Sequence, residues 1–161
     1  MLSEVFLDEE TEALIKNNII LTIGNLEEKE KIANFAKKYN TKAKIHVKID
    51  TGFGRYGFLY TEKDNILKAV ENTDFVQVQG VYTHFSKPIK EKWTKIQFER
   101  FKSLFEDIRK INSDVIFHCS ASTAFLLYPE MNCDCIRIRF MYSRKSYGKF
   151  FRTKKDRKFS V

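Results

Sequence analysis

The feature that most constrains the fold is an alternation of short β-branched runs with longer segments of helical periodicity. Five runs are rich in Val and Ile and end in polar or small residues: 19–23, 45–49, 76–82, 115–118 and 135–138. Parallel strands need a long connection between them, and a helix is the usual one. The alternation therefore predicts an α/β fold built on a parallel sheet or barrel.

The segments between these runs carry helix signals. Asn25 followed by Glu28 is a variant of the capping box and predicts a helix start. Thr61 with Asp64 predicts a second start. The longest segment, from about Lys90 to Ile111, has an apolar stripe at three- and four-residue steps, typical of a helix packed on a sheet. The stripe consists of Phe98, Phe101, Phe105 and Ile108. A last helix begins near Ala121 and ends near Tyr128, because Pro129 disfavours helical geometry in the residue before it.

Charge divides the chain into two parts. The net charge is +8, and residues 139–161 account for all of it, with nine Lys or Arg against Asp156. Residues 1–138 have equal numbers of basic and acidic groups. We expect residues 1–138 to form one folded domain and residues 139–161 to be a basic, disordered tail. Nucleic-acid binding through this tail is the less favoured alternative, since a basic run is more often a solvated segment.

Several classes of protein are excluded by what the sequence lacks. It has no apolar run of 18 residues and no basic-then-apolar leader, so we expect neither a membrane span nor a signal peptide, and a cytoplasmic location. The cysteines, Cys119, Cys133 and Cys135, are odd in number and crowded together, which predicts free thiols. No second Cys/His pair accompanies Cys133 and Cys135, so we expect no metal site.

Ligands of parallel βα folds lie at the carboxyl ends of the strands. The second run is followed by a glycine-rich segment, residues 50–58, in which Arg55 is placed to reach an anion. The third ends in residues 82–86, which include His84. After the fourth, Ser120 and Ser122 stand where a strand passes into a helix, and such a turn offers free N–H groups to a phosphate. Arg137 lies among apolar neighbours, where a charge needs a partner or a ligand.

Taken together, these motifs resemble the alanine racemase family. Residues 44–57, KIHVKIDTGFGRYG, match its segment in which a strand ends in lysine, followed by Asp-Thr-Gly, an arginine and a glycine. Three further pieces follow in the family's order: residues 80–85, His118 with Ser122, and Asp134 with Arg137. The resemblance covers about residues 3 to 138. It implies a partial (β/α)8 barrel of the TIM type, roughly strands four to eight.

The resemblance also implies a cofactor, pyridoxal phosphate, and an amino-acid substrate, alanine. Arg55 would approach the phenolic oxygen of the cofactor, and Lys48 would orient Arg55, as a carbamate in some racemases. His84 would lie beside the pyridine ring, Ser122 would bind the phosphate, and Arg137 would donate to the pyridine nitrogen. A purely structural reading stays open for each residue: Lys48 and Arg55 as solvated strand-end charges, His84 and His118 as core histidines, Ser120 as a helix cap.

The sequence also departs from the family. It has no counterpart of the Schiff-base lysine of the first barrel strand, nor of the catalytic tyrosine that the carboxyl-terminal domain of a partner subunit supplies. Arg139 stands where the family has a phosphate-contacting glycine. We therefore expect a racemase fragment that is inactive by itself. The alternative is a non-catalytic module that binds phosphate or pyridoxal phosphate, completes a barrel with a separate piece, or self-associates through exposed sheet edges.

Overall fold

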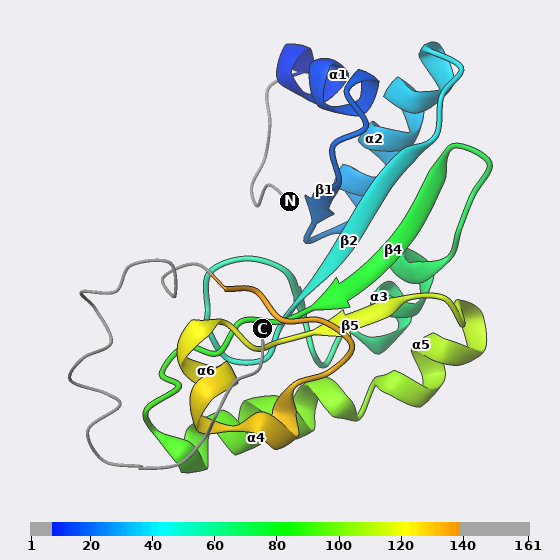
Figure 1. The fold of residues 1–161 in the computed structure, drawn as a ribbon. Helices are drawn as coiled ribbons and strands as arrows, with labels where there is room; N and C mark the ends of the chain where they lie inside the picture. Colours follow the sequence, from blue (N-terminus) through cyan, green and yellow to red (C-terminus); the bar gives the residue numbers. More distant parts are fainter. Residues whose placement is uncertain (1–7, 139–161) are drawn as a thin grey trace, which may run out of the picture.

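A sheet of five parallel strands forms the centre of the protein (Figure 1). The structure is a computed structural model and describes residues 8–138. The strands are β1 (Leu21–Ile23), β2 (Ala43–Asp50), β3 (Phe58–Leu59), β4 (Val76–Tyr82) and β5 (Ile116–His118). Their order is β1-β2-β4-β5, and β3 pairs with the end of β2. Because all pairings are parallel, the carboxyl ends of the strands meet at one edge of the sheet.

Helices connect the strands, as the sequence predicts. They are α1 (Asp8–Lys16), α2 (Leu26–Lys38), α3 (Lys63–Val70), α4 (Glu91–Lys102), α5 (Phe105–Ile111) and α6 (Ser122–Leu127), with a 3-10 turn, η1, at Pro129–Met131. Helix α2 contacts β1, β2 and β4, and α3 contacts β2. Figure 1 shows α4 and α5 in succession along the lower margin of the molecule. The repeated βα order confirms the α/β prediction.

The strand β2 is buried on both of its faces. Ile45, Val47 and Ile49 belong to the main hydrophobic core, together with Ile32 and Ala36 of α2. His46, Lys48 and Asp50 point to the opposite face, because side chains alternate along a strand, and they are buried as well. A sheet with an apolar outer face under helices and a filled inner face is the wall of a barrel.

Three local predictions are wrong. Residues 135–138 are not a strand, and only Arg137 forms a bridge, with Ala121. The reason is that Asp134 and Cys135 direct their N–H groups to a single acceptor, the Phe117 carbonyl, instead of into a ladder. The predicted helix 90–111 divides at Ser103 and Leu104, where the Leu104 N–H turns back to the Phe101 carbonyl.

The third error concerns the start of α3. Thr61 does not cap this helix, which begins after Glu62. The carboxylate of Glu62 accepts a hydrogen bond from the Leu59 N–H, so it closes the preceding turn. Helix α1 and the two-residue strand β3 were not predicted.

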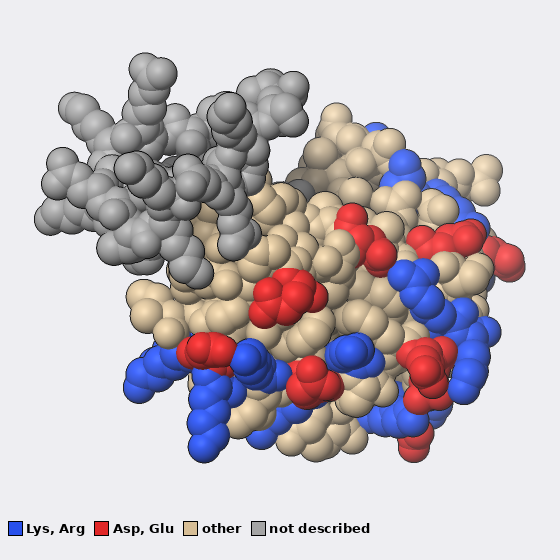
Figure 2. Space-filling view, turned by 60° about the horizontal axis from the view of Figure 1, so that its bottom comes forward, with Lys and Arg blue, Asp and Glu red and all other residues tan. Residues whose placement is uncertain are grey.

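Charges of both signs are mixed on the face shown in Figure 2, as expected for residues 1–138. The predicted basic tail, residues 139–161, lies outside the described residues, and so does Arg139. None of the helices in residues 8–138 is both long enough and apolar enough to cross a membrane.

Candidate functional site at the carboxyl ends of the strands

A layer of polar and aromatic side chains fills the inner face of the sheet. The strand register aligns Thr22 with His46, and Tyr82 with His118. The Nδ1 atom of His46 lies 3.0 Å from Nε2 of His118, and the Tyr82 ring stacks on the His118 ring at 4.8 Å between centroids. Gly80 makes room for this layer, since a Cβ atom there would lie 2.8 Å from Cε1 of His46.

Burial keeps the two histidines of this layer neutral. It lowers the pKa of His46 to about 4, helped by the positive charge of Arg137. It lowers the pKa of His118 to about 3, again with help from Arg137. In a neutral pair, one imidazole donates the shared hydrogen bond and the other accepts it. The layer of His46, Tyr82 and His118 is thus uncharged at neutral pH, and it lies next to the carboxyl ends of the strands.

The side chain of Arg137 lies over this layer. Its guanidinium carbon lies 4.6 Å from the centroid of the Tyr82 ring, and its Nη2 donates to the Thr83 carbonyl at 2.9 Å. The same Nη2 lies 3.1 Å from Nδ1 of His84. Because a guanidinium has no acceptor, Nδ1 of His84 must be the unprotonated nitrogen. Nε of Arg137 is buried and has no hydrogen-bond partner among the described residues.

Asp50 shapes the loop that carries Arg55. Its carboxylate accepts four backbone hydrogen bonds, from Gly52, Phe53, Gly54 and Arg55, at 2.7–3.1 Å. Burial acts to raise the pKa of Asp50, but these four N–H donors outweigh it and hold the pKa below its ordinary value. An ionised carboxylate therefore organises the loop at neutral pH.

The end of this loop also fits closely against β2. A Cβ atom on Gly57, whose φ is +114°, would lie 2.7 Å from the Lys48 carbonyl oxygen, so only glycine fits here. Lys48 itself is buried, and its Nζ lies 5.1 Å from the centroid of the Tyr56 ring. Tyr56 donates to the carboxylate of Glu28 at 2.6 Å, which fixes the loop to α2.

Four of the five predicted site residues share one electrostatic environment. The pKa of His84 is lowered to about 4, first by burial and then by the charges of Arg137, Arg55 and Lys48. Phe53 links two of these groups, because its ring lies 4.5 Å from the Arg55 guanidinium and 5.6 Å from the His84 ring. We call Lys48, Arg55, His84 and Arg137 the strand-end cluster. Three cations beside a neutral histidine form a site suited to an anionic ligand.

Ser122 is the fifth predicted residue. It is buried at the first position of α6, directly after Ala121, which bridges Arg137. Helix α6 has only six residues, so its dipole is a weak reason to expect a phosphate. Among the residues described, no group of three or more His, Cys, Asp or Glu is placed to hold a metal ion.

Comparison with known proteins identifies the family of the chain. A family model described as the N-terminal domain of alanine racemase matches residues 1–138. The chain belongs to the alanine racemase family. It is 34% identical to an alanine racemase of Methanococcus maripaludis over 135 residues, which are 81% of this chain and 36% of that protein. It is 35% identical to an alanine racemase of Clostridium perfringens over 142 residues, 85% of this chain and 36% of that protein.

Solved structures of alanine racemases have the same fold. The structure of alanine racemase from Clostridium difficile 630 in complex with cycloserine superposes with a TM-score of 0.78 at 28% identity. The match covers 85% of this chain and 39% of that one. The chain therefore spans little more than a third of the length of these relatives. The part of these structures that matches the chain belongs to the barrel domain of alanine racemase. The match therefore confirms the fold prediction for the described strands.

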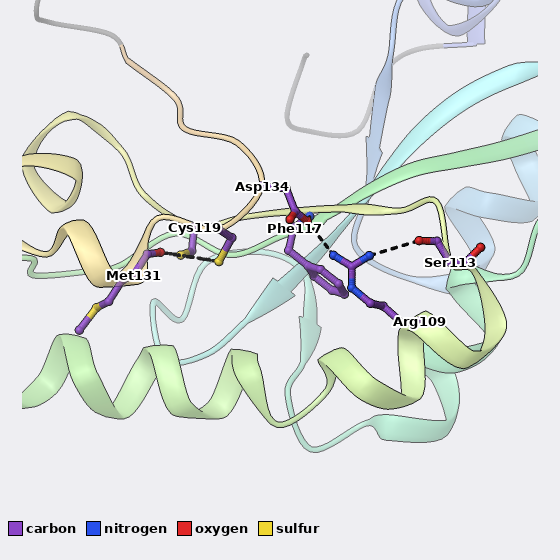
Figure 3. A network of polar contacts seen from close by, with 7 residues as sticks. Arg109, Ser113, Phe117, Cys119, Met131 and Asp134 are labelled. Carbon is purple, nitrogen blue, oxygen red and sulfur yellow. Dashed lines mark hydrogen bonds and ion pairs between the residues drawn. The ribbon is translucent and has the colours of Figure 1, made fainter.

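Some residues of the candidate site were not identified from the sequence. Tyr82 and His46 were read only as parts of strands, and Phe53 only as part of a glycine-rich loop. The signal for His46 was present, because it alternates with the core residues Ile45 and Val47. Tyr82 gave no such signal: simple alternation puts it on the face of Val78, and an irregularity in the register between β2 and β4 moves it to the other face. Asp134, by contrast, has a structural role: it accepts from the Phe117 N–H at 2.8 Å and pairs with Arg109 at 3.0 Å (Figure 3).

Proposed function

We propose that the strand-end cluster is the cofactor side of an alanine racemase barrel and binds pyridoxal phosphate without a covalent bond. Family membership supports the choice of ligand. The geometry of Arg137 carries the proposal: Nη2 is held by Thr83 and His84, while the buried Nε lacks a partner in residues 8–138. A buried donor without an acceptor is costly, so a ligand acceptor at this position would be favourable.

We assign Arg137 to the pyridine nitrogen. When bound, pyridoxal phosphate supplies an electron-withdrawing ring that stabilises negative charge on the α-carbon of an amino acid. An arginine does not readily give up its proton, so Arg137 would leave the ring nitrogen unprotonated. This would limit charge delocalisation and favour racemisation over other reactions of the cofactor. His84 accepts a hydrogen bond from Arg137 and would lie beside the ring.

The remaining roles concern the anionic groups of the cofactor. Arg55 would approach the phenolic oxygen, from a loop that Asp50 fixes through backbone hydrogen bonds. Lys48 would orient Arg55, and its burial and its position on β2 suit a fixed supporting group. Ser122 would bind the phosphate. These three assignments follow the family resemblance, and the concentration of positive charge around His84 supports them.

We further propose that these 161 residues do not racemise alanine by themselves. Racemisation with two bases needs a lysine and a tyrosine on opposite sides of the substrate carbon. The counterparts of both lie in family segments that this sequence does not match. Alanine is the proposed substrate of the assembled enzyme.

A second candidate is a module that completes a barrel with a separate polypeptide. The observation that favours it is the position of β1, which pairs only with β2 among the described residues. A parallel barrel has no edge strand, so β1 would accept a neighbour. Alanine racemase activity that appears only on mixing with the missing family segments would favour this candidate.

The test of cofactor binding is a calorimetric titration with pyridoxine 5′-phosphate. This analogue keeps the ring nitrogen, the phenolic oxygen and the phosphate but has no aldehyde, so surface lysines cannot react with it. We expect one site per chain. Arg137→Ala and Arg55→Ala each remove a charge-assisted hydrogen bond, of about 1.5–3 kcal/mol, and should weaken binding by at least tenfold.

Lys95→Ala is the matched control. It also removes one positive charge, but from an exposed pair with Glu91 on α4. Unchanged binding in this variant would show that net charge alone does not explain the losses. Equal losses in all three variants, or no saturable binding at all, would exclude the proposed site.

A further inference from the structure

Two thiols lie in contact beneath the segment that leads to Arg137. The Sγ atoms of Cys119 and Cys133 are 3.7 Å apart. Both thiols also donate to one acceptor, the Met131 carbonyl, at 3.1 Å from Cys119 and 3.6 Å from Cys133. Figure 3 shows Cys119 beside Met131 in this network. A disulfide needs the sulfurs about 1.7 Å closer than this contact.

The two thiols differ in access and in acidity. Cys119 is completely buried, whereas Cys133 is only partly buried. The contact with the Cys119 thiol holds the pKa of Cys133 below its ordinary value. The same contact, with burial, raises the pKa of Cys119. A more acidic accessible thiol beside a buried one is the arrangement of an attacking and a resolving cysteine.

We propose that Cys119 and Cys133 are a site of oxidative modification, at which a peroxide forms an intramolecular disulfide. The Cys133 thiolate attacks one oxygen of hydrogen peroxide, which breaks the O–O bond and leaves a sulfenic acid and a hydroxide ion. The Cys119 sulfur then attacks the Cys133 sulfur, and the S–O bond breaks as the S–S bond forms. Overall, two thiols are oxidised, one peroxide is reduced, and two waters are released.

The disulfide would close a loop that contains α6, Ser122 and η1. It would also remove two of the three donors to the Met131 carbonyl, leaving the hydroxyl of Ser120 at 3.4 Å. The third cysteine, Cys135, takes no part in this contact. It is exposed, and its thiol donates to the Ile136 carbonyl. The inference does not depend on cofactor binding.

The test is to treat the purified chain with hydrogen peroxide, block the remaining thiols and map the disulfides by mass spectrometry. Trypsin is unsuitable, because residues 111–136 contain no Lys or Arg and all three cysteines fall in one peptide. A protease that cleaves after acidic residues separates them, after Glu130 and after Asp134. We expect a cross-linked pair of peptides that joins Cys119 to Cys133, and a fall from three free thiols to one that dithiothreitol reverses.

Cys135→Ser is the control variant, since this exposed residue can change without disturbing the core. It should form the same cross-link, whereas Cys133→Ser should form none. The proposal is overturned if the cross-link joins Cys135 to either partner, if only dimers between chains form, or if Cys133 is oxidised to sulfinic acid while Cys119 stays free.

Discussion

The histidines of this protein illustrate how a single residue acquires its chemistry from packing. His46, His84 and His118 come from three different strands or strand ends, yet each is surrounded by buried groups and cations that lower its pKa. The sequence could place His84 and His118 at strand ends, because parallel strands share one edge. The pairing of His46 with His118 could not be predicted, since it depends on the register of strands 72 residues apart.

The same limit applies to Arg137. Its position among apolar residues predicts that it needs a partner, and the structure supplies Thr83, His84 and the Tyr82 ring. The identity of these partners depends on how the segment after β5 crosses the sheet. Local patterns do not determine that crossing.

Stability should fall as the solution is acidified from pH 7 to pH 5. Below their ordinary pKa of about 6.5, histidines of the unfolded chain bind protons, while His46 and His118 stay neutral in the folded state down to about pH 4 and 3. The unfolded state then binds more protons, so the free energy of unfolding drops, by up to about 1.4 kcal/mol per pH unit for each histidine. Urea denaturation at pH 7, 6 and 5 measures this.

His46→Gln provides the control for this titration. The variant cannot bind a proton at position 46, so its stability should depend less steeply on pH than that of the unchanged chain. A free energy of unfolding that is constant or rises between pH 7 and 5 would contradict the neutral histidine pair.

At the scale of secondary structure, patterns with a local cause were predicted well. The runs 45–49 and 76–82 are strands, and the runs 19–23 and 115–118 contain shorter ones. The prediction of a strand at 135–138 was wrong, because the presence of β-branched residues does not determine which acceptors the backbone N–H groups bind. The break between α4 and α5 could not be predicted, because the apolar stripe continues through it. Phe101 is buried before the break, and Ile108 is buried after it.

The start of α2 confirms the predicted cap and allows a quantitative test. The Asn25 side chain accepts from the Glu28 N–H at 2.8 Å, and the Glu28 carboxylate accepts from the Gly24 N–H at 2.7 Å. Asn25→Ala should lower the free energy of unfolding by about 1 kcal/mol. Thermal or urea denaturation measures the loss, and Asn25→Asp, which keeps the acceptor, should restore most of it. An equal loss in both variants would show that the hydrogen bond to the Glu28 N–H does not account for the stability of this helix start.

For the whole molecule, the described residues are a section of a barrel wall. Helices cover one face of the sheet, and the other face presents a neutral layer of His46, Tyr82 and His118 with the strand-end cluster above it. The chain spans about 36% of the length of its curated relatives, and we propose that the enzymatic reaction requires more than these residues. We propose that cofactor recognition, by contrast, requires mainly the groups that this section holds.

The most direct test of that claim is ¹⁵N NMR of the histidine rings during titration with pyridoxine 5′-phosphate. The chain has three histidines, so the spectrum is simple, and His84→Gln assigns the decisive signal. We predict that the His84 ring nitrogens shift as the analogue binds, that the buried pair shifts less, and that Arg137→Ala abolishes the change. A His84 signal that stays fixed while other residues respond would place the ligand elsewhere and contradict the proposed site.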